Sequence, residues 1–179
     1  MKNQGRHGDF EQVVLPHLDA AYNLARWLTR NDHDAQDVAQ EAVLRAYRFF
    51  DGLRGEPRPW LLAIVRNSCF TWLAANRPAE TVGLEDGAVD LLPSEEDGPE
   101  VQAARNFDRR MLNDAIAGLP AQFREVLILR ELEDLSYKDI ARIADVPIGT
   151  VMSRLARARR LLAQSLTVTS NISGTQMNK

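Results

Sequence analysis

The chain has few of the features that mark secreted, membrane-spanning or disulfide-bonded proteins. It has one cysteine, Cys69, which excludes an internal disulfide. No apolar run approaches the ~18 residues that a membrane span requires. The first ten residues, MKNQGRHGDF, lack the apolar segment of a secretory signal. We therefore expect a cytoplasmic protein with no membrane insertion.

The sequence also lacks the patterns of common catalytic and metal sites. Its histidines, His7, His17 and His33, have no cysteine or carboxylate framework at metal-ligand spacing. A phosphate-binding loop and a GxSxG nucleophile elbow are absent. Cys69 lies in an apolar stretch, where a buried filler is a better interpretation than a redox sensor. We expect no metal and no other cofactor, and an enzyme is the least favoured class.

Charge is distributed unevenly along the chain. The net charge of −3 would by itself argue against a nucleic-acid binder. Residues 1–77, 78–104 and 105–179, however, carry about +1, −8 and +4. The acidic middle segment also contains three prolines and three glycines, which is typical of a flexible linker. The sequence thus predicts two small domains, 1–77 and 105–166, joined by the linker 78–104 and followed by a frayed polar tail, 167–179.

Apolar residues recur at helical spacing and alternating strand patterns are absent, so the fold class is all-α. The N-terminal domain has three predicted helices, over about 10–28, 35–50 and 58–76, the second of them capped by Asp32 or Asp34. The C-terminal domain has four, over about 105–118, 121–133, 135–141 and 148–166. Ser136 and Asp139 have capping-box spacing at the start of the third of these.

The last predicted helix has two distinct faces. Val151, Leu155, Ala158 and Leu162 point toward a core, and Arg154 and Arg159 flank the opposite face. That opposite face consists of Met152, Ser153, Ala156, Arg157 and Arg160. Two helices joined by the short turn 145–147, the second with an arginine-bearing face, are typical of a DNA-binding helix-turn-helix. A solvated basic helix, or a surface that binds an acidic partner, is the alternative.

The second and third predicted helices each carry a weaker signal. Leu44 lies opposite the apolar stripe of its helix and should be exposed. Its polar and acidic frame resembles a protein-binding spot, although single exposed leucines are common. On the third helix, Asn67 and Thr71 form a polar strip beside Trp60, which suggests stacking on an unpaired base. For Trp60 itself, a place in the core is the favoured interpretation.

Three motifs occur in a fixed order along the chain. They are AQDVAQEAVLRAY (35–47), WLLAIVRN (60–67) and LPAQFREVLILRELEDLSYKDIARIADVPIGTVMSRLARARRLL (119–162). With them, the chain resembles an extracytoplasmic-function (ECF) sigma factor of the sigma-70 family over about 10–77 and 108–166. The two domains would then be sigma regions 2 and 4. A sigma factor performs no chemistry itself but supplies promoter binding and strand melting to RNA polymerase.

The resemblance implies roles for residues in both domains. The residues implied to contact core RNA polymerase are Asp37, Gln40, Glu41, Leu44 and Arg48. Those implied to engage the melted −10 strand, with the loop 51–56, are Asp51, Arg54, Trp60, Arg66, Asn67 and Thr71. Those implied to bind the −35 element are Thr150, Met152, Ser153, Arg154, Ala156, Arg157 and Arg160. Promoter DNA and an anti-sigma factor are the other implied partners, and the free protein is expected to be a monomer.

Two departures from the family pattern bear on these roles. The third helix ends WLAANRP with Arg77 alone in place of a basic cluster, so duplex contacts there should be weaker. Met152 stands where the family often has lysine or arginine, so the −35 preference is not carried over. A sigma-factor mimic and a helix-turn-helix regulator without initiation activity are the alternatives. The retained arginines argue against a mimic, and the motif at 35–47 argues against a simple regulator.

Overall fold

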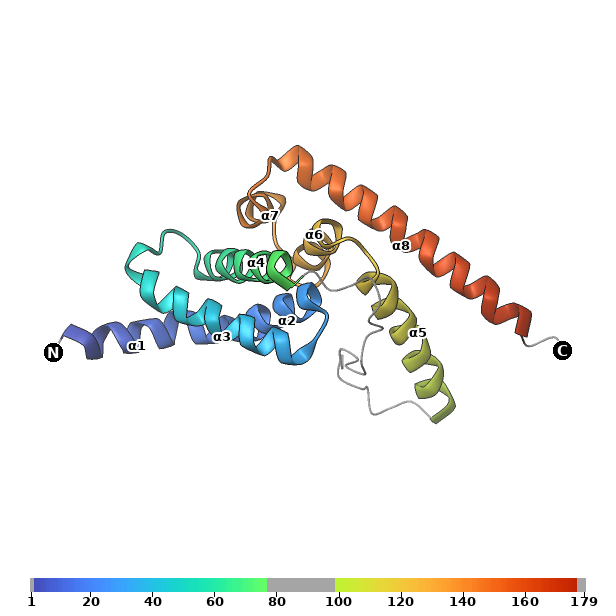
Figure 1. Ribbon diagram of the computed structural model, residues 1–179, viewed down its shortest axis with the longest axis horizontal. Helices are drawn as coiled ribbons and strands as arrows, with labels where there is room; N and C mark the ends of the chain where they lie inside the picture. The colour runs from blue at the N-terminus through green and yellow to red at the C-terminus, as the bar shows by residue number, and fades with distance from the viewer. Residues whose placement is uncertain (1, 77–98, 177–179) are drawn as a thin grey trace.

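Helices account for nearly all of the part of the chain that the structure, a computed structural model, describes, which is residues 2–76 and 99–176 (Figure 1). No strand occurs within those two ranges, which confirms the all-α class. The linker predicted at 78–104 lies outside the described residues up to 98. From Pro99 onward the chain is already helical.

The N-terminal domain contains four α-helices. They are α1 (Lys2–Val14), α2 (Leu18–Thr29), α3 (Asp32–Phe49) and α4 (Pro57–Asn76). The single helix expected over 10–28 is divided into α1 and α2. Pro16 lies in the short 3-10 turn between them, Leu15–His17, because proline has no N–H for the helical ladder. α2, α3 and α4 pack on one another, and α1 contacts α4.

The start of α3 differs from the prediction at its cap. Asn31, rather than Asp32 or Asp34, is the N-cap, and its side-chain oxygen accepts a hydrogen bond from the backbone N–H of Asp34 at 3.0 Å. Arg30 ends α2 in the left-handed conformation, with a φ of 63°. The chain therefore turns sharply at 30–31, and the two aspartates fall inside the first turn of α3. There their negative charges interact favourably with the positive end of the helix dipole.

The core of the N-terminal domain combines small residues of α3 with larger ones of its neighbours. Every buried side chain of α3 is an alanine except Val38, so α2 and α4 can approach it closely. Leu24 and Leu28 of α2, and Leu61 and Val65 of α4, fill that space and are fully buried.

The C-terminal domain is built from α5 (Pro99–Ala117), α6 (Ala121–Glu131), α7 (Tyr137–Ala144) and α8 (Ile148–Gln176). Its core joins apolar residues of α6, α7 and α8, and α5 packs against α8. α8 is longer than predicted: it continues past Leu166 to Gln176, and the Thr167 hydroxyl donates to the carbonyl of Ala163 within it. No proline interrupts this stretch, so the helical ladder continues.

The two domains are in direct contact. α2 packs against α6, and α4 packs against α7. In Figure 1, α6 and α7 lie directly above α2 and α4, while α5 and the far end of α8 extend to the right. The sequence alone had left open whether the free protein is compact or extended.

Candidate functional site

The helix-turn-helix predicted in the C-terminal domain is formed by α7 and α8. Ser136 caps α7: its hydroxyl oxygen accepts from the backbone N–H of Asp139 at 3.1 Å and donates to the Asp139 carboxylate at 2.6 Å. The predicted capping interaction is thus present. The shorter aspartate side chain bonds the Ser136 hydroxyl instead of the Ser136 backbone. Asp145 ends α7 in the left-handed conformation, and Pro147 precedes the first turn of α8.

The two faces of α8 are arranged as predicted. Val151, Leu155 and Ala158 are buried, and Leu162 is half-buried. Met152 is 54% exposed. The other exposed residues of the predicted outer face are Ser153, Ala156, Arg157 and Arg160. This face projects guanidinium groups and one thioether into solvent, a chemistry that suits phosphate and base-edge contacts in a major groove.

Two of the α8 arginines also have contacts inside the C-terminal domain. Arg159 donates to Oε1 of Glu131, in the last turn of α6, at 2.6 Å. Arg154 is half-buried, and its charge lowers the pKa of Glu125 on α6 against the larger opposing effect of burial. Thr150 is half-buried, and its carbonyl accepts from the Ser153 hydroxyl. Among the predicted outer-face residues, the exposed ones with long side chains are Met152, Arg157 and Arg160.

The exposed leucine predicted on α3 is part of a larger apolar groove. Leu44 is 55% exposed, as its place opposite the apolar stripe requires. A groove of about 510 Å³ lies beside it, and its lining comes from both α2 and α3. The lining residues are Leu18, Ala21, Tyr22, Gln36, Ala39, Gln40, Val43 and Leu44. Sequence reasoning missed the share of α2 because helical periodicity does not tell which helices are neighbours.

Polar and charged side chains surround this groove. Asp37, Gln40, Glu41 and Arg48 are exposed on α3, and Glu41 accepts a hydrogen bond from Arg45 at 2.9 Å. An apolar centre with a polar rim is the usual composition of a protein-binding surface.

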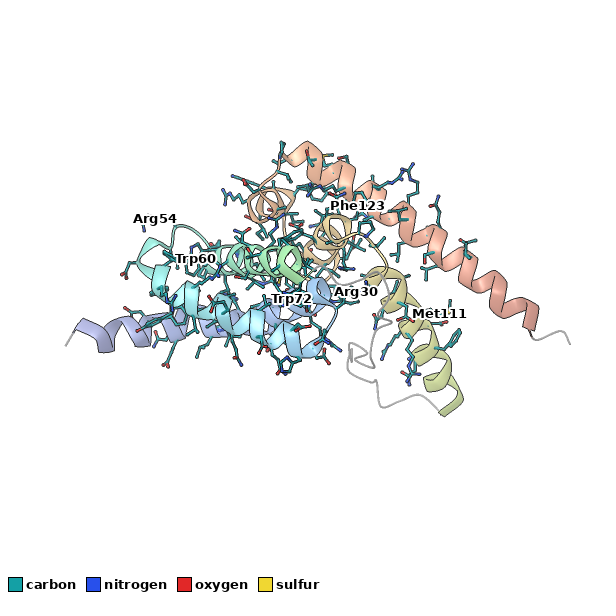
Figure 2. All side chains as sticks on the ribbon, viewed as in Figure 1. Arg30, Arg54, Trp60, Trp72, Met111 and Phe123 are labelled. Atoms are coloured by element: carbon teal, nitrogen blue, oxygen red, sulfur yellow. The ribbon has the colours of Figure 1, made fainter. Side chains whose placement is uncertain are left out.

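The polar strip on α4 is present, but its members differ in exposure. Asn67 and Thr71 are exposed, and the Thr71 hydroxyl donates to the Asn67 carbonyl. Trp60 is half-buried and packs against the core, so part of its ring occupies the predicted core position and part is exposed. Asp51 and Arg54 are exposed in the loop before α4, and Figure 2 places Arg54 near Trp60 at that end of the domain.

The chain matches two families of known domains, one over each half. Sigma-70 region 2 matches residues 13–78, and sigma-70 region 4 matches residues 109–162. The ECF RNA polymerase sigma-E factor of Haemophilus influenzae is 37% identical over 151 residues, which cover 80% of this chain and 79% of that protein. The chain belongs to the ECF sigma factors.

Other sigma factors are similar to this chain over most of its length. The RNA polymerase sigma-H factor of Pseudomonas aeruginosa is 34% identical over 165 residues, covering 88% of this chain and 86% of that one. Among solved structures, the sigma factor RpoE of Bartonella quintana, in complex with the anti-sigma factor NepR, aligns with a TM-score of 0.69 and 28% identity. The alignment covers 89% of this chain and 98% of that one. Region 2 of this sigma factor thus comprises α2–α4, and region 4 comprises about the second half of α5, then α6, α7 and about the first half of α8.

One predicted DNA-binding residue of region 2 is engaged with region 4. The Arg66 Nε donates to Oε1 of Glu125 at 2.8 Å, and the guanidinium lies 4.1 Å from the centre of the Phe70 ring. Glu125 is 0% exposed, and burial raises the pKa of its carboxyl above the usual range despite the hydrogen bond from Arg66. Sequence reasoning missed this contact. The one available signal was a lone carboxylate inside the apolar run of α6.

Residues 2–76 and 99–176 contain no group of three or more His, Cys, Asp or Glu side chains that could hold a metal ion. Within the same ranges, no helix has the length and apolar character that a membrane crossing needs.

Proposed function

We propose that this sigma factor directs core RNA polymerase to specific promoters and promotes melting of the −10 element. One observation carries the proposal: a single chain presents an apolar protein-binding groove on region 2 and an arginine-bearing helix on region 4. Neither surface would be sufficient alone, since a helix-turn-helix is common to many regulators. The polymerase performs the chemistry and the sigma factor supplies recognition.

The α3 surface is proposed to bind a helical element of core polymerase. Leu44 would be its anchor, because an exposed apolar side chain at the edge of a groove gains most from burial. Asp37, Gln40, Glu41 and Arg48 would form the polar rim that fixes orientation and partner choice.

Region 4 is proposed to place α8 in the major groove at the −35 element. Arg157 and Arg160 would contact phosphates or guanine, and Met152 would face base edges. Thr150, Ser153, Arg154 and Ala156 lie on or beside the same face. Binding should weaken steeply with salt, because each phosphate contact releases condensed counterions.

Region 2 is proposed to hold the melted −10 strand. Asn67 and Thr71 supply hydrogen-bonding groups on the exposed side of α4, and the half-buried ring of Trp60 lies on that side by helical spacing. An aromatic ring beside an amide can stack and pair with a base that has left the duplex. Binding the separated strand makes melting more favourable, since the duplex gains nothing from these contacts.

Run-off transcription with purified core polymerase on genomic promoter fragments tests the proposal. Leu44→Asp should abolish binding to core and the start-site-specific transcript, because it places a charge at the proposed anchor. Phe49→Asp is the matched control: Phe49 is also exposed on α3, but on another face and outside the groove. No transcript from the wild-type protein, with a known sigma factor active in parallel, would overturn the proposal. It would instead favour a mimic that binds a partner without initiating.

An anti-sigma factor is the further partner we propose, with the free sigma factor monomeric and acting in the cytoplasm. The support is the likeness to RpoE of Bartonella quintana, whose solved structure is a complex with the anti-sigma factor NepR. Co-expression with a candidate anti-sigma factor followed by size-exclusion chromatography tests this partner. A stable 1:1 complex that no longer binds core polymerase is the expected result.

A further inference from the structure

Regions 2 and 4 meet at an interface where two carboxylates of region 4 contact side chains of region 2. Glu133, just after α6, is 6% exposed. Its carboxylate accepts from Nη2 of Arg58 at 2.5 Å and from Nδ2 of Asn23 at 2.7 Å. Nη1 of Arg58 also donates to the backbone carbonyl of Glu133 at 2.8 Å. Both oxygens of this buried carboxylate are therefore satisfied by residues of the other domain.

The second carboxylate is that of Glu125. It accepts from Arg66 of α4, whose side chain is itself mostly buried. Arg124 adds a contact next to it: its guanidinium donates to the Leu28 carbonyl at the end of α2, as well as to the Leu119 and Ala117 carbonyls. The interface thus consists of directed, charge-assisted hydrogen bonds at several points and is specific in register.

This arrangement conflicts with simultaneous binding of two promoter elements. The −10 and −35 positions are about 25 base pairs apart, or about 85 Å at ~3.4 Å per pair. A domain of about 75 residues is about 30 Å across, so two such domains in direct contact through α4 and α7 span about 60 Å and cannot reach both elements. Residues 77–98, between the domains, can span at most about 70–80 Å at ~3.3–3.6 Å per residue. The chain is thus long enough for two-element binding only when the domains separate.

We propose that Glu125 and Glu133 act as an internal latch that holds this sigma factor closed and occupies Arg58 and Arg66 until core polymerase separates the domains. Carboxylates and phosphates bind guanidinium groups with the same geometry, so these glutamates occupy the groups that a DNA backbone would otherwise bind. The proposal rests on the proposed function for one point only, which is that opening allows promoter binding. The closed state itself is independent of it.

The latch can open without leaving a buried charge unpaired. Arg154, within region 4, also stabilises the ionised form of Glu125, so this carboxylate keeps a cationic neighbour after Arg66 leaves. Arg58 is already one-third exposed, and water replaces Glu133 around it on opening. Ion pairs across such an interface give specificity more than stability, because desolvation offsets much of their attraction. A closed state of this kind is suited to reversible opening.

The distance between the domains in the free full-length protein tests the latch. Spin labels attached to His33→Cys on α3 and Gln164→Cys on α8 report it, since both positions are exposed. Cys69 is buried and should remain unlabelled in the folded protein. The wild-type background should give one short, narrow distance distribution by pulsed dipolar spectroscopy. Glu133→Gln should move at least half of the molecules to a longer, broader distribution, and Arg58→Ala should do the same from the other side of the interface.

Glu131→Gln is the matched control, because Glu131 is two residues from Glu133 but pairs with Arg159 inside region 4. It should leave the distribution unchanged. A long, broad distribution in the wild-type background would overturn the proposal, as would Glu133→Gln and Arg58→Ala variants that both stay closed with normal helical circular dichroism. If the latch variants open as expected but the protein gives no transcript with core polymerase, the latch proposal is supported and the proposed function is refuted.

Discussion

The Arg159 guanidinium donates a hydrogen bond to the Glu131 carboxylate at 2.6 Å and thereby joins α8 to the last turn of α6. Both side chains are about half exposed, and the pKa of Arg159 is raised by this bond. Arg157 lies two residues earlier on the same helix and is exposed, with no ion-pair partner in the described part of the chain. Neighbouring arginines of one helix therefore have different roles, one within region 4 and one toward solvent.

Replacing these two arginines separately should distinguish the roles. Arg157→Ala should weaken promoter binding by the holoenzyme and lower the salt slope of log K by about 1, as expected when one phosphate contact is lost. Arg159→Ala should leave promoter preference unchanged and cost at most about 1 kcal/mol of unfolding free energy, because exposed ion pairs contribute little. Fluorescence anisotropy across a salt series and thermal unfolding measure the two effects. A loss of promoter binding in Arg159→Ala, with promoter binding unchanged in Arg157→Ala, would refute this difference in roles.

Met152 should give the −35 element a preference for thymine. Its thioether is exposed on the outer face of α8, where an apolar side chain can contact the thymine C5-methyl group but cannot pair with guanine. Replacing individual −35 thymines by deoxyuridine removes only that methyl. At one position this change should weaken wild-type binding several-fold while leaving Met152→Ala unaffected. Equal losses for both proteins at every position would exclude Met152 from base readout.

Cys69 makes stability depend on pH in the alkaline range. Burial raises the pKa of its thiol to about 12, and the nearby Arg66 offsets only part of that effect. The unfolded chain ionises at a lower pH than the folded one, so the unfolded state loses its proton first and stability falls as pH rises. Between pH 8 and pH 10, wild type should lose about 1 kcal/mol more than Cys69→Ala, at about 1.4 kcal/mol per pKa unit. Guanidinium denaturation at both pH values measures this, and parallel losses would show that the thiol ionises equally in both states.

Patterns within a single helix predicted the features that depend on that helix alone, such as its buried face and its N-cap. Helical spacing correctly placed Leu44 in solvent and Leu155 in the core, and the Ser136 cap followed from sequence spacing. The break at Pro16 was missed because the apolar period continues across it. The cap at Asn31 was missed because Asp32 and Asp34 are equally favoured capping residues.

Contacts between distant segments had no comparable signal. The resemblance implied a DNA-binding role for Arg66, and the structure pairs it with Glu125, fifty-nine positions away. Periodicity gives the face of a helix but not the helix that covers it. The groove beside Leu44 was missed for the same reason, because three of its eight lining residues come from α2.

The stability of the helix-turn-helix should depend on the Ser136 hydroxyl. Ser136→Ala removes the acceptor for the Asp139 backbone N–H and the donor to the Asp139 carboxylate, and it should cost about 1 kcal/mol. Ser153→Ala is the matched control: Ser153 lies within α8, where its hydroxyl bonds only the Thr150 carbonyl and alanine is the better helix former. Thermal unfolding should therefore show a lower Tm for the first variant and an equal or higher Tm for the second. Equal Tm values would mean that α7 is held by its buried face, through Ile140 and Ile143, and that the cap adds nothing.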